Sequence, residues 1–234
     1  MKYKSAAISL TYIKNGESSI ISKILTKEMG LQTFFVKGVR SKKSKKKLSL
    51  FEPLKLLHID ASFDTKKTLQ YLTDINLASN FNNQNNKMYS HFVSFFIAEV
   101  TSKVTQENEQ NKMLFNFVWE TTNKIYRSKE KDPNFPLIYL IELTKYLGFY
   151  PSNTKLKNSF FELEEGCFAE KRTPAKTYLN KQQSMYLKSL LKNDDVLIPK
   201  KEKSQLLKEL MLYYKLHHYN LDRVTSHIII EELN

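Results

Sequence analysis

Residues Gly30 to Leu50 read Gly-Leu-Gln-Thr-Phe-Phe-Val-Lys-Gly-Val-Arg-Ser-Lys-Lys-Ser-Lys-Lys-Lys-Leu-Ser-Leu. The first half is rich in β-branched and aromatic residues, which favour a β-strand. The second half holds five lysines within six positions, namely Lys42, Lys43, Lys45, Lys46 and Lys47. A hydrophobic core cannot take up so many unpaired ammonium groups. The stretch therefore predicts a strand that leads into a cationic loop, exposed to water or held against an anionic partner.

The positive charge of the chain is concentrated at this end. Residues 1–50 contain twelve Lys or Arg against Glu17 and Glu28, which is +10 of the formal net charge of +13. Charge gathered on one module is typical of proteins that bind nucleic acid or an anionic membrane. Lys37 and Arg40 extend the basic stretch back onto the predicted strand, which favours a binding site over a solvated loop without a partner.

Length and composition narrow the class of protein. A chain of 234 residues with 41% hydrophobic residues can bury a substantial core in one large or two small domains. No apolar run reaches the roughly 18 to 20 residues of a membrane span, and the start does not resemble a signal peptide, so we expect a cytoplasmic protein without a membrane partner. The single Cys167 permits neither an internal disulfide nor a cysteine-based zinc site.

The N-terminal third predicts a small antiparallel barrel. Alternation of polar and apolar residues, with turns between, predicts five short strands at Tyr3–Ile13, Ser19–Thr26, Leu31–Val39, Leu48–Ile59 and Lys67–Leu72. Pro53 marks an edge or a bulge in the fourth, because proline cannot donate to a strand ladder. Five such strands suit an OB-fold, which closes on itself and so has no free edge. An SH3-like barrel is the alternative that periodicity leaves open.

The rest of the chain predicts helices. Asn80 to Asn86 is a polar breaker, which we interpret as the boundary between an OB-fold domain at residues 1–79 and a helical domain at residues 80–234. Apolar residues then recur every three or four positions, which predicts helices at 88–104 and 113–125. The stretch 137–147 is apolar almost all round, which predicts a buried helix, and further helices are expected at 182–191, 201–218 and 224–233, with a small hairpin at 160–168. The expected fold class is α+β, a small antiparallel β-barrel followed by an all-helical domain with a hairpin insertion.

No pattern in the chain indicates catalysis or a metal site. The five histidines are scattered, the acidic pairs lie beside turns or termini, and there is no Gly-rich phosphate loop and no nucleophile elbow. The residues therefore offer no candidate for a catalytic or metal site, and we expect no cofactor. Aromatic residues in the basic end favour single-strand binding, because bases stack on aromatic rings; the candidates are Tyr12, Phe34, Phe35, Phe51 and Phe63, most of which we expect in the core.

A second, weaker basic cluster follows the second predicted helix. It consists of Lys124, Arg127, Lys129 and Lys131. Such a cluster can receive an acidic peptide tail, or it can stabilise the carboxyl end of the helix, where cations are favoured. Both interpretations remain open from the sequence.

The order of several short motifs resembles the bacterial recombination mediator family RecO. The motifs are Gly16-Glu17, Leu25-Thr26 with Glu28 and Gly30-Leu31, Val36-Lys37-Gly38-Val39-Arg40, Lys43-Ser44, Phe51 with Pro53, Leu147-Gly148-Phe149-Tyr150-Pro151, and Tyr213-Tyr214-Lys215-Leu216-His217 followed by Ser226. The resemblance covers nearly the whole chain and is densest in residues 16–54. Many family members also carry four cysteines that bind zinc after the Leu-Gly-x-x-Pro segment. Here that region holds only Cys167, so we expect the hairpin to be held by packing.

The resemblance implies a non-enzymatic DNA repair and recombination mediator. Such proteins bind single- and double-stranded DNA, anneal complementary strands, contact the acidic tail of single-stranded-DNA-binding protein and, with RecR, help to load RecA; a nucleoid-associated cytoplasmic location follows. By position, the DNA-binding residues are Lys37, Arg40, Lys42 and Lys43, with Lys45, Lys46 and Lys47 as a local extension. The residues alone also permit an RNA-binding or ribosome-associated OB protein, or a protein-interaction scaffold whose lysines are only solvated.

Overall fold

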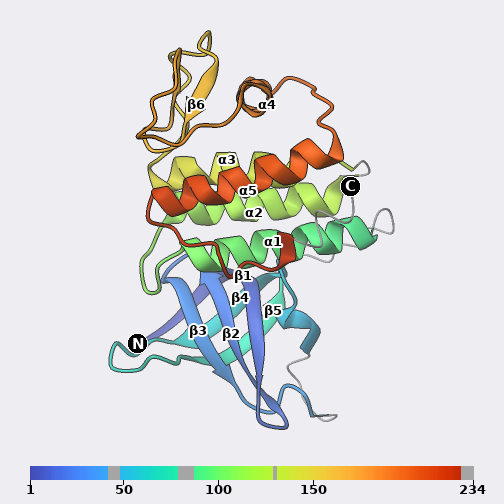
Figure 1. Cartoon of the computed structure of the whole chain (residues 1–234). Helices are drawn as coiled ribbons and strands as arrows, with labels where there is room; N and C mark the ends of the chain where they lie inside the picture. Colours follow the sequence, from blue (N-terminus) through green and yellow to red (C-terminus); the bar gives the residue numbers. More distant parts are fainter. Residues whose placement is uncertain (42–47, 79–86, 129–130, 228–234) are drawn as a thin grey trace. The chain divides into compact units, whose positions relative to one another are not determined.

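The chain forms two compact units, Met1–Lys131 and Asp132–Asn234. The computed structural model describes residues 1–41, 48–78, 87–128 and 131–227. Within these ranges the first unit contains the antiparallel sheet, a short 3-10 helix and two α-helices, and the second contains three α-helices and a small hairpin (Figure 1). The domain boundary expected at residues 79 and 80 lies outside the described ranges and stays a prediction.

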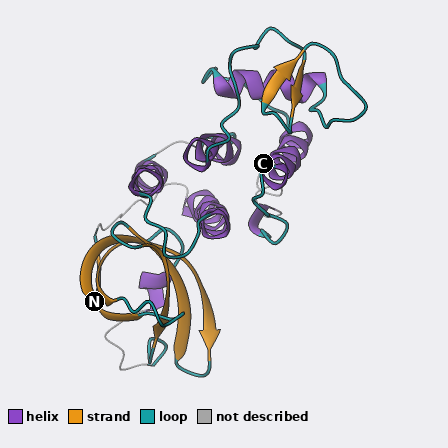
Figure 2. Cartoon of the chain, turned by 90° about the vertical axis from the view of Figure 1, so that its left-hand side faces the viewer, coloured by secondary structure: helices purple, strands orange, loops and turns teal. Residues whose placement is uncertain are grey.

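Five antiparallel strands form the barrel of the first unit. They are β1 (Lys2–Asn15), β2 (Ser19–Thr26), β3 (Gly30–Val36), β4 (Leu56–Ser62) and β5 (Tyr71–Leu77), in the order β3-β2-β1-β4-β5. The Phe35 N–H donates to the Gln70 carbonyl at 3.0 Å and the Gln70 N–H donates to the Thr33 carbonyl at 2.8 Å, which joins β3 to the start of β5. Figure 2 shows the strands curving into a ring. The α+β class and the OB-like barrel are confirmed.

Several strand limits differ from the prediction, and the fourth and fifth strands also end later than expected, at Ser62 and Leu77. The third strand ends at Val36, because Gly38 takes a positive φ of 68° and turns the chain. Residues Leu48–Phe51 form a 3-10 helix, η1, and Leu54 has a φ of 57°, so the fourth strand begins only at Leu56. The fifth strand begins at Tyr71, because the residues before it form a turn closed by the Gln70 side chain, whose Nε2 donates to the Asp64 carbonyl at 3.0 Å.

The core of the barrel explains the pattern of apolar residues. Inward-facing side chains from every strand, and Phe51 from η1, are almost fully buried: Ala7, Ile20, Ile24, Phe34, Val36, Val39, Phe51, Leu57, Ile59, Ala61, Leu72 and Ile75. Their alternation with outward-facing residues gave the period of two. Burial of Phe51 in this core, with Leu48 and Leu50 packed against it, also holds the chain directly after the lysine-rich segment.

Two helices and the segment between them complete the first unit. Helices α1 (Lys87–Val104) and α2 (Lys112–Arg127) agree with the predicted helices to within two residues at each end. The connecting segment packs on the β2–β3 turn: the Asn108 N–H donates to the Leu31 carbonyl at 3.0 Å, and Lys23 Nζ lies 3.0 Å from Glu107 Oε1. These contacts tie the helices to one end of the barrel.

Gly30 is the point of closest approach between this segment and the barrel. It has a φ of +67°, and a Cβ at this position would lie 2.0 Å from the Glu109 carbonyl oxygen. We expect Gly30→Ala to lower the free energy of unfolding by about 2 to 4 kcal/mol, because the strained backbone and the displaced segment act together. Gly16→Ala is the control, since Gly16 has a φ of +62° with nothing within 4 Å, and it should cost about 1 kcal/mol. Equal losses in urea unfolding would contradict the prediction.

The second unit is built on helices α3 (Phe135–Leu147), α4 (Lys181–Leu191) and α5 (Lys200–Leu216), with the hairpin strands β6 (Phe160–Glu162) and β7 (Cys167–Ala169). Gly148 ends α3 in the left-handed conformation, with a φ of 88°, and a capping box between Asn180 and Gln183 begins α4. These elements match the prediction closely. The helix expected at 224–233 lies mostly outside the described residues. No described helix is both long enough and apolar enough to cross a membrane.

Candidate nucleic-acid interface

The basic residues that follow β3 are anchored to the rim of the barrel. The Arg40 N–H donates to the Ser18 carbonyl at 3.0 Å, and Arg40 Nη1 donates to the Gly16 carbonyl at 3.0 Å. The Ser41 N–H donates to the Gly38 carbonyl at 3.0 Å, which closes the turn after the strand. Arg40 is therefore held against the β1–β2 turn while its side chain stays exposed.

The five predicted loop lysines come directly after this anchored turn. Lys42, Lys43, Lys45, Lys46 and Lys47 all lie outside the described residues. The chain that flanks them is fixed on both sides, at Arg40 by the contacts just given and at Phe51 by burial in the barrel core. The described residues on either side of this segment, up to Ser41 and from Leu48, thus both belong to the barrel unit.

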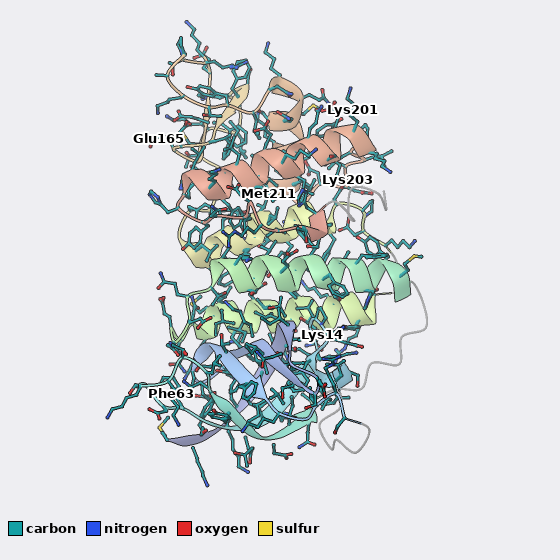
Figure 3. The ribbon with its side chains drawn as sticks, turned by 60° about the horizontal axis from the view of Figure 1, so that its bottom comes forward. Lys14, Phe63, Glu165, Lys201, Lys203 and Met211 are labelled. Carbon is teal, nitrogen blue, oxygen red and sulfur yellow. The ribbon has the colours of Figure 1, made fainter. Side chains whose placement is uncertain are left out.

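Other exposed cations lie on the same barrel. Lys37 is exposed directly after β3, with its Nζ 5.9 Å from the centroid of the Phe35 ring. Lys14 is exposed near the end of β1, just before the β1–β2 turn that Arg40 contacts (Figure 3). The sequence analysis did not single out Lys14. It lies two residues before Gly16, whose carbonyl accepts the hydrogen bond from Arg40. Exposed basic side chains of this kind can attract phosphate.

Most of the aromatic candidates belong to the core, as expected. Phe34 and Phe51 are fully buried, and Tyr12 packs against the same cluster. Phe63 is half-buried beyond β4 (Figure 3). Phe35 faces outward from β3, so it is the one candidate of this group on the outer surface of the sheet.

A surface aromatic residue that the sequence analysis missed is Tyr71. Its side chain is 44% exposed, and its ring lies edge to face with Phe35, with a centroid distance of 6.5 Å. The alternation of Tyr71 with the buried Leu72 was the available signal. The contact with Phe35 depends on closure of the barrel between β3 and β5, which periodicity along the chain does not reveal.

The second basic cluster is described only in part. Lys124 and Arg127 lie in the last turn of α2, and both are exposed. Lys131 places its Nζ 5.9 Å from the centroid of the Tyr89 ring, and Lys129 lies outside the described residues. Cations in the last helical turn interact favourably with the helix dipole whether or not a partner binds.

In the second unit, the two motifs that end α3 and α5 pack on each other. The Phe149 ring stacks on the His217 ring with a centroid distance of 4.7 Å and an interplanar angle of 9°. The Tyr213 hydroxyl donates to the Phe149 carbonyl, and the Tyr214 hydroxyl donates to the Leu140 carbonyl at 2.7 Å. These motif residues therefore stabilise the helical unit.

The fully buried Tyr214 permits a stability prediction. Burial raises the pKa of Tyr214 well above its ordinary value of 10, because the ionised form would lose its hydration. The protonated form is thus favoured in the folded state, and the stability it supplies is present below pH 10 and falls as the pH rises above 10. We expect Tyr214→Phe to lower the free energy of unfolding by about 1 to 2 kcal/mol at pH 7.

The same variant should also reduce the loss of stability in alkaline solution. Unfolding in urea at pH 7 and at pH values above 10 measures both effects. A variant as stable as the wild type at pH 7, or one with an unchanged alkaline loss, would contradict the role given to this hydroxyl.

The hairpin region does not fit a zinc site. Cys167 is its only cysteine, and no group of three or more His, Cys, Asp or Glu among the described residues could hold a metal. Packing holds the hairpin instead: the buried rings of Phe161 and Phe168 lie 5.0 Å apart. Lys176 Nζ also donates to the buried Glu162 carboxylate at 2.5 Å, a hydrogen bond that raises the pKa of Lys176.

Two family models and several relatives of known name match this chain, and the relatives match it over its full length. The family model described as recombination protein O N terminal matches residues 1–81, and the model described as recombination protein O C terminal matches residues 92–224. A DNA repair protein RecO of Flavobacterium psychrophilum is 33% identical over 239 residues, which is 100% of this chain and 99% of the relative. The DNA repair proteins RecO of Flavobacterium johnsoniae and Christiangramia forsetii are 32% and 30% identical, with the same coverage.

Proposed function

The chain belongs to the RecO family of DNA repair and recombination proteins, and on that premise we propose that it binds single- and double-stranded DNA through the rim of its barrel and anneals complementary strands. The observation that carries the proposal is the anchoring of Arg40. It is exposed, it is fixed by two hydrogen bonds to the β1–β2 turn, and it immediately precedes a segment with five lysines.

The proposed mechanism is electrostatic and involves no bond chemistry. Two DNA strands repel each other through their phosphates. Lys37, Arg40 and the lysines at 42, 43 and 45–47 contact those phosphates, release condensed counterions and lower the repulsion, so that complementary bases can meet. The reaction needs neither a nucleotide nor a metal, and the protein acts as a mediator and not as an enzyme.

The proposed partners follow from the family. With RecR, the protein helps to load RecA onto DNA that is coated by single-stranded-DNA-binding protein, and it works in the cytoplasm at the nucleoid. We assign Lys124, Arg127, Lys129 and Lys131 to the acidic tail of single-stranded-DNA-binding protein. The exposure of Lys124, Arg127 and Lys131 supports this assignment, and their position around the end of α2 equally supports stabilisation of the helix.

We also propose that the functional division of the chain falls between residues 79 and 80. The change from strands to helices supports it, since β5 ends at Leu77 and α1 begins at Lys87. In this division the barrel binds DNA and the helical part contacts proteins. α1 and α2 then belong to the helical domain by function, although they form a compact unit with the barrel.

Annealing of two complementary labelled oligonucleotides tests the proposed function. The protein should accelerate the appearance of duplex, and neither removal of divalent ions by EDTA nor omission of nucleotide should abolish the acceleration. A protein that leaves the rate unchanged would contradict the proposal. Stronger binding to structured RNA than to single-stranded DNA would point to an RNA-binding protein instead.

A further inference from the structure

The outer surface of the barrel carries an apolar row that leads to an aromatic pair. In the strand register, Ile13 pairs with Ile21 and Ile21 pairs with Phe35, and Phe35 meets Tyr71 where the barrel closes. Ile13 is 64% exposed and Tyr71 is 44% exposed, so both ends of the row are open to solvent. Ile21 and Phe35, between these ends, are half-buried, so the row is a partly exposed apolar patch, the kind of surface that can bind a partner.

Lysines flank both rings of the aromatic pair. Lys37 Nζ lies 5.9 Å from the centroid of Phe35, and Lys67 Nζ lies 5.8 Å from the centroid of Tyr71. Lys67 also lies 3.6 Å from a carboxylate oxygen of Asp64, with both side chains about half exposed. An exposed ion pair of this kind contributes little, so a phosphate can replace the carboxylate.

We propose that Phe35 and Tyr71 stack on unpaired bases, while Lys37 and Lys67 contact the adjacent phosphates, and that this aromatic pair strengthens binding to single strands and not to duplex. The inference rests on the nucleic-acid binding proposed above. Aromatic rings between lysines are the combination that binds single strands, because each base offers a flat apolar face and each linkage a negative charge. In a duplex the bases already stack on one another, so no base face is free to stack on Phe35 or Tyr71.

The exposed position of Tyr71 makes it the residue to change. Tyr71→Ala should weaken binding to a labelled thymine oligonucleotide of about 16 nucleotides by roughly 5- to 30-fold in fluorescence anisotropy. Binding to a blunt duplex of equal length should stay within about twofold of the wild type. The salt dependence of single-strand binding should keep its slope, because the substitution removes no charge. Tyr71→Phe should bind like the wild type.

A matched control is Phe95→Ala in α1. Phe95 is 40% exposed, close to the value for Tyr71, but its ring neighbour is His91 and not a lysine-flanked aromatic residue. This variant should bind both DNA forms like the wild type. Tyr71→Leu serves as a second test variant, because it removes the ring but keeps apolar volume if the Ala variant proves unstable in thermal unfolding.

Two results would overturn the inference. One is an unchanged affinity for the single strand in both Tyr71→Ala and Tyr71→Leu, and the other is an equal loss for single strand and duplex. A wild-type protein that shows no salt-dependent DNA binding at all would contradict the proposed function itself, and with it this inference. The wild-type titration therefore separates the failure of the proposed function from the failure of the stacking site.

Discussion

Replacing Lys42, Lys43, Lys45, Lys46 and Lys47 together by Ala is expected to weaken single-stranded DNA binding by roughly 100- to 3,000-fold at 0.1 M salt. Each phosphate contact contributes about 0.7 to the slope of log affinity against log salt. Between 1 M and 0.1 M salt, each contact therefore raises the affinity by about a factor of five. The range corresponds to three to five contacts made by these lysines. At protein concentrations near the wild-type dissociation constant, annealing should become nearly as slow as without protein.

A charge-matched variant separates a specific site from general electrostatic attraction. Replacing five exposed lysines of the second unit by Ala lowers the formal net charge by the same amount; these are Lys155, Lys157, Lys171, Lys192 and Lys201. It should lose far less affinity than the loop variant, because it leaves the barrel unchanged. Equal losses in the two variants would show that net charge and not the loop determines binding.

Reversing the two described charges after β3 should have the second largest effect. Lys37→Glu together with Arg40→Glu removes two phosphate contacts, which costs roughly 25-fold at 0.1 M salt, and places two carboxylates where phosphates would lie. The loss of affinity should therefore exceed 25-fold for single strand and duplex alike. Anisotropy titrations with both DNA forms measure it.

The control for this pair must also reverse two charges. Lys112→Glu together with Lys201→Glu does so at exposed positions in the first turns of α2 and α5, neither of which is a strand of the barrel. Arg40→Glu also removes the hydrogen bond to the Gly16 carbonyl, so thermal unfolding must show that the variant remains folded at the assay temperature. Comparable losses of affinity in both double variants would contradict a binding surface at the end of β3.

The sequence predicted those features that depend on local patterns. Alternation along β1 and β2, and the apolar residues of α1, α2 and α3, reflect which residues of a single element are buried. The sequence therefore placed the limits of these elements to within a few residues. The charge of the lysine-rich segment is also local information. The same holds for Gly148, whose lack of a side chain suits the left-handed end of α3.

The features that it did not predict depend on contacts between distant residues. Tyr71 reaches Phe35 only because the backbone of Gln70 pairs with the middle of β3, and the turn before β5 is closed by the Gln70 side chain. The hydrogen bond from Arg40 to Gly16 likewise crosses from one turn to another. Periodicity cannot place such partners, because it contains no information on which segments meet.

The motifs that carried the family resemblance illustrate the same limit. The Leu-Gly-Phe-Tyr-Pro segment and the Tyr-Tyr-Lys-Leu-His segment were recognised by order alone. In the structure Phe149 lies against His217 and accepts a hydrogen bond at its carbonyl from Tyr213. The two segments thus join the end of α3 to the end of α5, a contact that neither segment reveals by itself.

The most direct test of DNA binding by the lysine-rich segment is a salt series of fluorescence anisotropy with a labelled single-stranded oligonucleotide, for the wild type and for the five-lysine Ala variant. The proposed site predicts a slope that is shallower in the variant by about 0.7 for each lost contact, or roughly 2 to 3.5 in all, with the variant still folded. An unchanged slope and an unchanged affinity would contradict it, and would move the search for the protein's function to its helical part.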